Sequence, residues 1–234
     1  MKRLTFSFDN GPEPGATEPL LDFLRERSIK ATFFVVGDRL DAAGLALARR
    51  AHREGHWIGN HTLSHGTPLG REGDAARVAR EIGETERLIG PLAHPDRLFR
   101  PNGAGALGPH LLSPAAVAYL AANRYTVITW NNVPGDFRPP HEAWLETALA
   151  TLDAQDWSLL VLHDPFIARM LDRLARFCDA LEARGIAIVQ SFPPSCILME
   201  RGVATPELAA CVTPASGVAP AEAQPSHPSQ RGQT

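Results

Sequence analysis

The chain has 234 residues, of which 44% are hydrophobic and 21% charged, as is usual for a soluble globular protein. A formal net charge of −3 excludes the strongly basic surface that attracts nucleic acid or an anionic membrane. No apolar run is long enough to span a bilayer, and no signal sequence opens the chain. We therefore expect a cytoplasmic protein without a nucleic-acid or membrane partner. The composition leaves the oligomeric state open.

Strands and helices are expected to alternate along the chain. β-Forming runs predict strands at 4–8, 31–36, 57–59, 97–99, 126–130, 158–162 and 186–189. Helical spacing of apolar residues predicts helices at 17–27, 38–54, 74–89, 114–123, 141–154 and 168–183. Thr17 and Asp38 are the expected N-caps of the first two helices. Strand–helix alternation of this length predicts a parallel α/β fold.

The composition also divides the chain. Residues 1–194 carry the alternating pattern and are expected to form one domain. Residues 195–234 form a C-terminal extension, in which Ala, Pro, Ser and Gln dominate from about residue 204, and we expect it to be largely disordered from there. Within the domain, the charged residues of the 74–89 helix are interpreted as a solvent-exposed face: Arg77, Arg80, Glu81, Glu84 and Arg87.

Polar and titratable residues follow the predicted strands at their C-terminal ends. In parallel α/β folds these ends lie on one face of the molecule, where ligands bind. Five strands contribute such residues, and their coincidence predicts a functional site. Its members in chain order are Asp9, Asn10, His61, His65, Arg100, Asp136 and His163.

Each of these residues also has a simpler interpretation. His61 and His65 are four apart, which suits two ligands of one metal ion, but they can also be loop histidines in unrelated hydrogen bonds. Asp9 can cap a turn, and His163 can be a core histidine. Arg100 can hold a carboxylate or be a surface charge. Asp136 is equally compatible with a solvated loop carboxylate.

These residues stand in motifs that resemble those of the polysaccharide deacetylases, a family of carbohydrate esterases. The segment 8–12, Phe-Asp-Asn-Gly-Pro, resembles the first motif, T-F-D-D-G-P, and 61–65 matches the second, H-[ST]-x-x-H. Phe-Arg-Pro at 99–101 resembles the third, 130–137 is a loose match to the fourth, and 160–163 fits L-x-x-H. The resemblance runs from residue 4 to residue 189.

The resemblance implies a distorted (β/α)7 barrel and metal-assisted hydrolysis of an N-acetyl group on an amino sugar or oligosaccharide. His61 and His65 would hold a divalent metal, expected to be zinc. Asp9 would act as general base, oriented by Arg100. His163 would act as general acid, held or tuned by Asp136. A backbone N–H near residues 102–103 would complete an oxyanion hole with the metal.

Two departures from the family motifs bear on function. The third metal ligand of the family is the second carboxylate of its first motif, and here that position is Asn10, a neutral and weaker ligand. Residues 101–105 read Pro-Asn-Gly-Ala-Gly where the family often has Pro-Pro-Tyr-Gly. Two alternatives therefore accompany a metal-dependent deacetylase: a metal-independent amidohydrolase of a small amide or ureide, and a non-catalytic carbohydrate-binding relative.

Overall fold

The computed structural model describes residues 1–72, 74–103 and 105–214. The strands are β1 (Arg3–Asp9), β2 (Thr32–Val35), β3 (Trp57–Asn60), β4 (Leu98–Phe99), β5 (Thr126–Ile128), β6 (Trp157–His163), β7 (Ala187–Val189), β8 (Ile197–Glu200) and β9 (Val203–Ala204). The α-helices are α1 (Thr17–Glu26), α2 (Ala42–Arg53), α3 (Ala75–Val78), α4 (Thr85–Ile89), α5 (Pro114–Ala122), α6 (Trp144–Asp153), α7 (Asp164–Ile167) and α8 (Leu171–Ala183). Both the parallel α/β class and the seven expected strands are confirmed.

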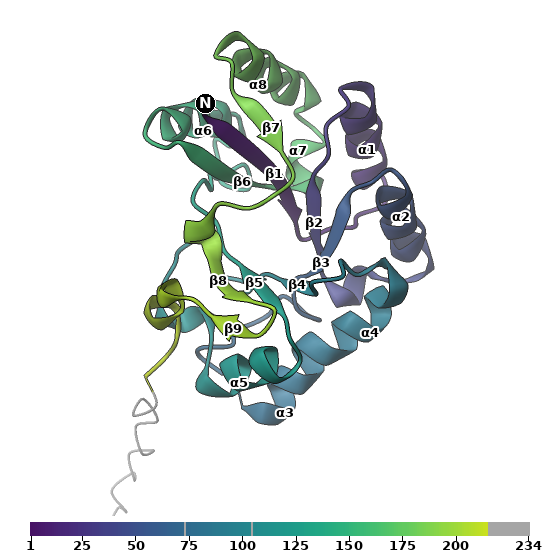
Figure 1. Cartoon of the computed structure of the whole chain (residues 1–234). Coiled ribbons are helices and arrows are strands. Elements are labelled where there is room, and N and C mark those ends of the chain that lie inside the picture. Colours follow the sequence, from purple (N-terminus) through teal and green to yellow (C-terminus); the bar gives the residue numbers. More distant parts are fainter. Residues whose placement is uncertain (73, 104, 215–234) are drawn as a thin grey trace, which may run out of the picture.

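The strands form one curved sheet with the helices around its outside (Figure 1). Its order is β6-β1-β2-β3-β4-β5-β8-β9, and β7 pairs with the first residues of β1. Strands β1 to β7 pair in parallel, whereas β8 and β9 are antiparallel. A bridge between Asn132 and Leu160 links the segment after β5 to β6, so the curved sheet closes on itself as a distorted barrel.

The core forms around central strands that are buried on both faces; in β1, the apolar residues Leu4, Phe6 and Phe8 alternate with buried polar ones. Six of the seven residues of β1 are buried. Phe6 and Phe8 of this strand pack against the surrounding helices, with Phe177 of α8 edge-on to Phe6 at 6.0 Å between ring centroids. Strands buried on both faces are what helices covering a parallel sheet require. No described helix is long and apolar enough to cross a membrane.

The C-terminal region departs from the expectation. Residues 197–204 form the β8–β9 hairpin, and β8 extends the sheet at β5. A 3-10 helix, η7 (Pro206–Cys211), follows, and Leu208 and Cys211 are buried in the core cluster around β5. Expected disorder from about residue 204 is therefore wrong for residues 204–214, and residues 215–234 lie outside the described part. Buried apolar contacts to distant elements offset the ordering cost that the local composition suggests.

Several helix starts also differ from the expectation. Asp41, not Asp38, caps α2, because its carboxylate accepts the Gly44 N–H at 2.8 Å. Thr17 is the first residue of α1 rather than its cap, and its hydroxyl donates to Asp164. The expected 74–89 helix contains a π-helical segment, η2 (Ala79–Glu84), between α3 and α4. Such segments are rare and occur often at functional sites.

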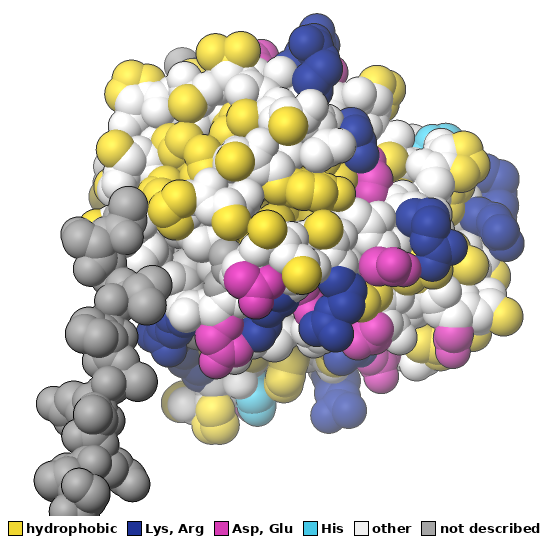
Figure 2. All heavy atoms as spheres, turned by 90° about the horizontal axis from the view of Figure 1, so that it is seen from below, with side chains coloured by type: hydrophobic (Ala, Val, Ile, Leu, Met, Phe, Trp, Pro, Cys, Tyr) yellow, Lys and Arg dark blue, Asp and Glu magenta, His cyan; other side chains and the backbone are white. Residues whose placement is uncertain are grey.

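Figure 2 shows the face on which α3 and α5 lie. Apolar side chains gather on one part of this face, and basic and acidic side chains are interspersed over the rest. Helix α5 carries no charged residue, and Ala118 and Ala122 are among its exposed positions. On this face, charges of both signs alternate, which agrees with a net charge near zero.

Candidate active site

Two titratable groups face each other at the C-terminal ends of the central strands. Asp9 ends β1 and His163 ends β6, and the two residues are partners in the parallel register. Both line a pocket of about 340 Å³ together with Asn10, His61 and His65. Five of the seven expected strand-end residues thus line one cavity, and the other two, Arg100 and Asp136, contact it through Asp9 and His163.

Asp9 is almost fully buried, and its environment favours the charged form. Burial alone would raise the pKa of its carboxyl, but the charge of Arg100, the nearby imidazoles and the hydrogen bond from Arg100 lower it below its usual value. Arg100 Nη1 donates to Asp9 Oδ1 at 2.8 Å. The contact uses one guanidinium nitrogen, because Nη2 donates to the Thr129 carbonyl at 3.1 Å. The charged form of Asp9 is therefore favoured, and its second oxygen, Oδ2, lies 3.7 Å from His61 Nε2.

His163 has the opposite electrostatic environment. Asp136, fully buried, accepts from the His163 backbone N–H at 2.7 Å and faces Nδ1 of its ring at 2.9 Å. Burial lowers the pKa of the imidazole, but the hydrogen bond and charge of Asp136 and the charge of Asp9 outweigh it and raise the pKa. Asp136 thus fixes the ring orientation and favours the protonated form, and Nε2 is the ring nitrogen that Asp136 does not contact.

His61 and His65 lie side by side, with 4.9 Å between their ring centroids. The Nδ1 of His61 faces the Arg100 carbonyl at 2.8 Å; since a carbonyl only accepts, Nδ1 carries the hydrogen and Nε2 keeps its lone pair. Burial lowers the pKa of His61 to about 4 and also lowers the pKa of His65. Both rings are therefore neutral, which is the form that binds metals.

The side chain of Asn10 completes this group. Its Oδ1 is buried and finds no hydrogen-bond partner among the described residues. Asn10 has a φ of 71°, a left-handed conformation that asparagine adopts more readily than most residues. A buried carbonyl oxygen without a hydrogen-bond partner, on a residue that lines the same pocket as two neutral imidazoles, fits the donor set of a divalent cation. No cluster of three His, Cys, Asp or Glu side chains suited to a metal occurs in the described residues, so the amide is the third donor available.

The rest of the pocket is apolar. Its wall includes Trp130, Val133, Phe137 and Phe166, and the loop of residues 101–105 contributes Pro101, Gly103 and Gly105. Position 103 has no room for a side chain, because a Cβ there would lie 2.3 Å from Leu111 and 3.1 Å from Trp130. The loop therefore lies against the Trp130 indole. Gly103 borders the cavity, as an oxyanion hole requires. The side chain of Asn102 donates to the Gly66 carbonyl.

Sequence analysis missed several residues of the site region. The wall residue Phe166 lies outside the family motifs, and so does His141, which stacks on Phe166 with 5.4 Å between the ring centroids. Glu81 is 2% exposed, so its assignment to a solvent-exposed face is wrong. The apolar residues Val78, Ile82 and Ile89 at helical spacing signal this, because Glu81 lies on the same side of the helix three residues after Val78.

A carboxylate and an imidazole that line one pocket of a parallel α/β barrel, with pKa values shifted in opposite directions, are an arrangement typical of acid–base hydrolases. Comparisons with known proteins narrow the class. A family model described as polysaccharide deacetylase matches residues 1–112. A chitooligosaccharide deacetylase of Sinorhizobium fredii (strain NBRC 101917 / NGR234) is 32% identical over 206 residues, 80% of this chain and 88% of that protein. The chain therefore belongs to the polysaccharide deacetylase family.

Two further similarities agree with this assignment. A peptidoglycan-N-acetylglucosamine deacetylase of Bacillus cereus is 28% identical over 164 residues, 70% of this chain and 73% of that protein. The solved structure of a family 4 acetyl xylan esterase from Clostridium thermocellum, in complex with a cobalt ion, superposes with a TM-score of 0.67 at 26% identity. That match covers 80% of this chain and 87% of the esterase. The expected distorted (β/α)7 barrel is confirmed.

Proposed function

We propose that this enzyme removes the acetyl group from an N-acetylated amino sugar or a short oligosaccharide of such sugars. One observation carries the proposal: Asp9 and His163 face one pocket with pKa values shifted in opposite directions. Amide hydrolysis needs a base for the attacking water and an acid for the leaving amine, and such opposed pKa shifts favour a charged carboxylate and a protonated imidazole. The deacetylase relatives support the N-acetyl group as the target.

In this reaction Asp9 Oδ2 takes a proton from the attacking water while Oδ1 stays bonded to Arg100. His163 Nε2 gives a proton to the nitrogen of the departing amino sugar, and Asp136 holds the ring at Nδ1. A backbone N–H at residues 102–103 is the proposed donor to the oxygen that becomes negatively charged. Trp130, Phe137 and the rest of the apolar wall exclude water and offer a surface for the apolar face of a sugar ring.

We also propose that a divalent metal, zinc in preference, is held by His61 Nε2, the His65 imidazole and Asn10 Oδ1. Two nitrogens and an oxygen are donors that zinc accepts. When bound, the ion supplies Lewis acidity at the acetyl carbonyl. The neutral amide of Asn10 makes this set less attractive to a dication than one with a carboxylate, so we expect weak retention of the metal.

A second candidate follows from the same residue. With Asn10 in place of a carboxylate, the site is also compatible with a metal-independent amidohydrolase of a small amide or ureide. A purely carbohydrate-binding role is disfavoured, because binding does not require an ion pair that keeps Asp9 charged or a carboxylate that keeps His163 protonated.

The deciding experiment strips the enzyme with a chelator, reloads it with zinc or cobalt, and measures acetate release from N-acetylchitooligosaccharides. We expect activity to fall on stripping and to return on reloading. Asn10→Asp should lower the Kd for metal about tenfold or more, because a carboxylate adds charge attraction to the dication. Asn123→Asp, which adds the same charge before β5 at the opposite end of the barrel, should leave the Kd unchanged. Full turnover in stripped enzyme would instead support the metal-independent candidate.

A further inference from the structure

The loop that carries both histidines, residues 61–65, has an unfavourable backbone. Thr62 has a φ of 68° and His65 a φ of 51°. Positive φ is uncommon for residues other than glycine and is a marked outlier for a β-branched residue such as threonine. Such conformations persist only where surrounding bonds fix them. The contacts of this loop therefore determine where the two imidazoles lie.

One side of the loop is held by backbone groups and by Asn60. The N–H groups of Gly37 and Asp38 donate to the carbonyls of Thr62 and Leu63 at 3.0 and 2.8 Å. Asn60 Oδ1 accepts the Thr62 N–H at 3.0 Å. Within the loop, the Thr62 hydroxyl accepts the His65 N–H at 3.1 Å. These bonds satisfy the carbonyls of Thr62 and Leu63 and the N–H groups of Thr62 and His65.

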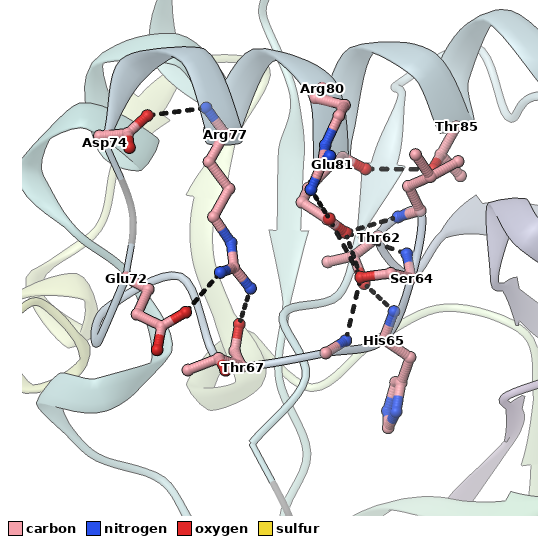
Figure 3. Close-up of polar contacts among 12 residues, drawn as sticks. Thr62, Ser64, His65, Thr67, Glu72, Asp74, Arg77, Arg80, Glu81 and Thr85 are labelled. Carbon is pink, nitrogen blue, oxygen red and sulfur yellow. Dashed lines mark hydrogen bonds and ion pairs between the residues drawn. The ribbon is translucent and has the colours of Figure 1, made fainter.

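The N–H groups in the middle of the loop are held by one side chain, Glu81. Its Oε2 accepts from the Leu63 N–H at 3.1 Å and from the Ser64 N–H at 3.0 Å, and the Ser64 hydroxyl donates to the same carboxylate at 3.0 Å (Figure 3). Arg80 approaches Oε1 at 3.3 Å. In Figure 3 the carboxylate of Glu81 reaches from the helix down to the loop, and the His65 ring extends from the other side of that loop.

The helix is locally adapted to this contact. Glu81 lies in the π-helical segment η2, and the Thr85 hydroxyl donates to its carbonyl at 3.0 Å. The side chain is 2% exposed, although a carboxylate loses favourable hydration on burial. Water could satisfy the N–H groups of an exposed loop without any buried charge. The sequence nevertheless places a carboxylate there, which fixes the loop more rigidly than solvent does.

We propose that Glu81 is a positioning residue for the histidine pair: its carboxylate holds the backbone of residues 63–64 and thereby sets the separation and direction of the His61 and His65 imidazoles. Glu81 touches neither substrate nor metal and acts through the loop. The inference rests on the proposed function in so far as the pair binds a metal. The placement of the loop itself does not depend on that function.

The test compares Glu81→Ala, Glu81→Gln and the control Glu84→Ala. The control lies on the same helical segment, where its side chain is exposed and pairs with Arg87. Hydrogen exchange of the Leu63 and Ser64 amides is measured against β1 amides as an internal reference for global stability. Cobalt binding is titrated, and kcat and KM are determined, at a temperature where all variants are folded.

In Glu81→Ala we expect exchange at Leu63 and Ser64 to rise at least about tenfold relative to β1, since those amides lose their acceptor. The Kd for cobalt should rise about tenfold or more, and kcat should fall more than KM changes. Glu81→Gln should fall between Ala and wild type, because its side-chain oxygen still accepts both N–H groups. Glu84→Ala should match wild type.

Unchanged relative exchange at Leu63 and Ser64 in Glu81→Ala overturns the proposal, as does a Gln variant no better than Ala. If exchange responds but neither the wild type nor any variant takes up cobalt, Glu81 still positions the loop and the metal in the proposed function is wrong. If exchange responds while cobalt affinity and kcat stay at wild-type values, Glu81 is a structural residue only and the proposal fails.

Discussion

The sheet has a regular half, formed by β6, β1 and β2, and an irregular half, formed by the strands from β3 to β9. The two halves contribute different residues to the site. In the first half, β1 and β6 pair through seven consecutive residues, from Arg3 with Trp157 to Asp9 with His163. In the second half, β3 and β4 share one pair, β4 and β5 share two, and β5 meets an antiparallel strand across a register shift. Asp9 and His163, the proposed base and acid, both come from the regular half.

The irregular half supplies one charged partner to each of these groups. Arg100, after β4, donates to Asp9, and Asp136, after β5, holds His163. The seven consecutive pairs between β1 and β6 fix the positions of Asp9 and His163, because a slip of one residue would turn every side chain of a strand to the other face. Residues of the irregular half influence the charge states of Asp9 and His163 and form part of the pocket wall.

The largest expected effect comes from the regular half. Asp9→Asn keeps the size and much of the hydrogen bonding of the side chain but removes the base, so kcat should fall by about 10²–10⁴. Metal content, measured on the same preparations, should stay at the wild-type level because Asp9 is not a proposed ligand. Loss of bound metal in this variant would make Asp9 itself a ligand and leave the site without a separate base.

A core substitution in the irregular half should affect stability rather than chemistry. Leu208→Ala removes a buried side chain of η7, and the free energy of unfolding should fall by about 2–5 kcal/mol. Urea denaturation measures this value, and the neighbouring exposed Glu207→Ala serves as the control. A Leu208→Ala variant as stable as the wild type would mean that residues beyond β9 contribute little to the core.

The smallest expected effect concerns the contact between the halves. Asp136→Asn replaces the carboxylate that raises the pKa of His163, so that pKa should fall. A general acid works only while protonated; activity should therefore be lost at lower pH than in the wild type as pH rises. At pH 8 we expect a drop in kcat of about tenfold. An alkaline limb at the wild-type pH would show that Asp136 does not tune His163.

Sequence analysis located the strands and the residues at their ends because both signals are local. Alternation and apolar runs identify the strands, and parallel pairing places Asp9, His61 and His163 at one end. The position of Glu81 was misjudged, because what makes its burial favourable is a pair of N–H groups in a loop 17–18 residues earlier. Such partners are close only in the folded chain.

The β8–β9 hairpin was missed for a related reason. Its apolar run, residues 197–199, is short and follows two prolines, and its stability comes from pairing with β5. The turn at Arg201 and Gly202, both at positive φ, was the local signal available. A glycine at such a turn between two β-forming segments favours a hairpin even where composition suggests disorder.

The place of β1 in the sheet has a consequence for how the protein is made. The ribosome releases β1 first, yet its neighbour β6 follows only after residue 157, and β7 after residue 187. The Arg100 guanidinium binds the Thr129 carbonyl, and the N–H of Thr129 in turn binds the Cys196 carbonyl. The nascent chain therefore carries Asp9, the proposed base, from the start without the guanidinium that sets its charge. We expect activity only after the last segment of the barrel has docked, and a truncated translation product that carries the family motifs should be inactive.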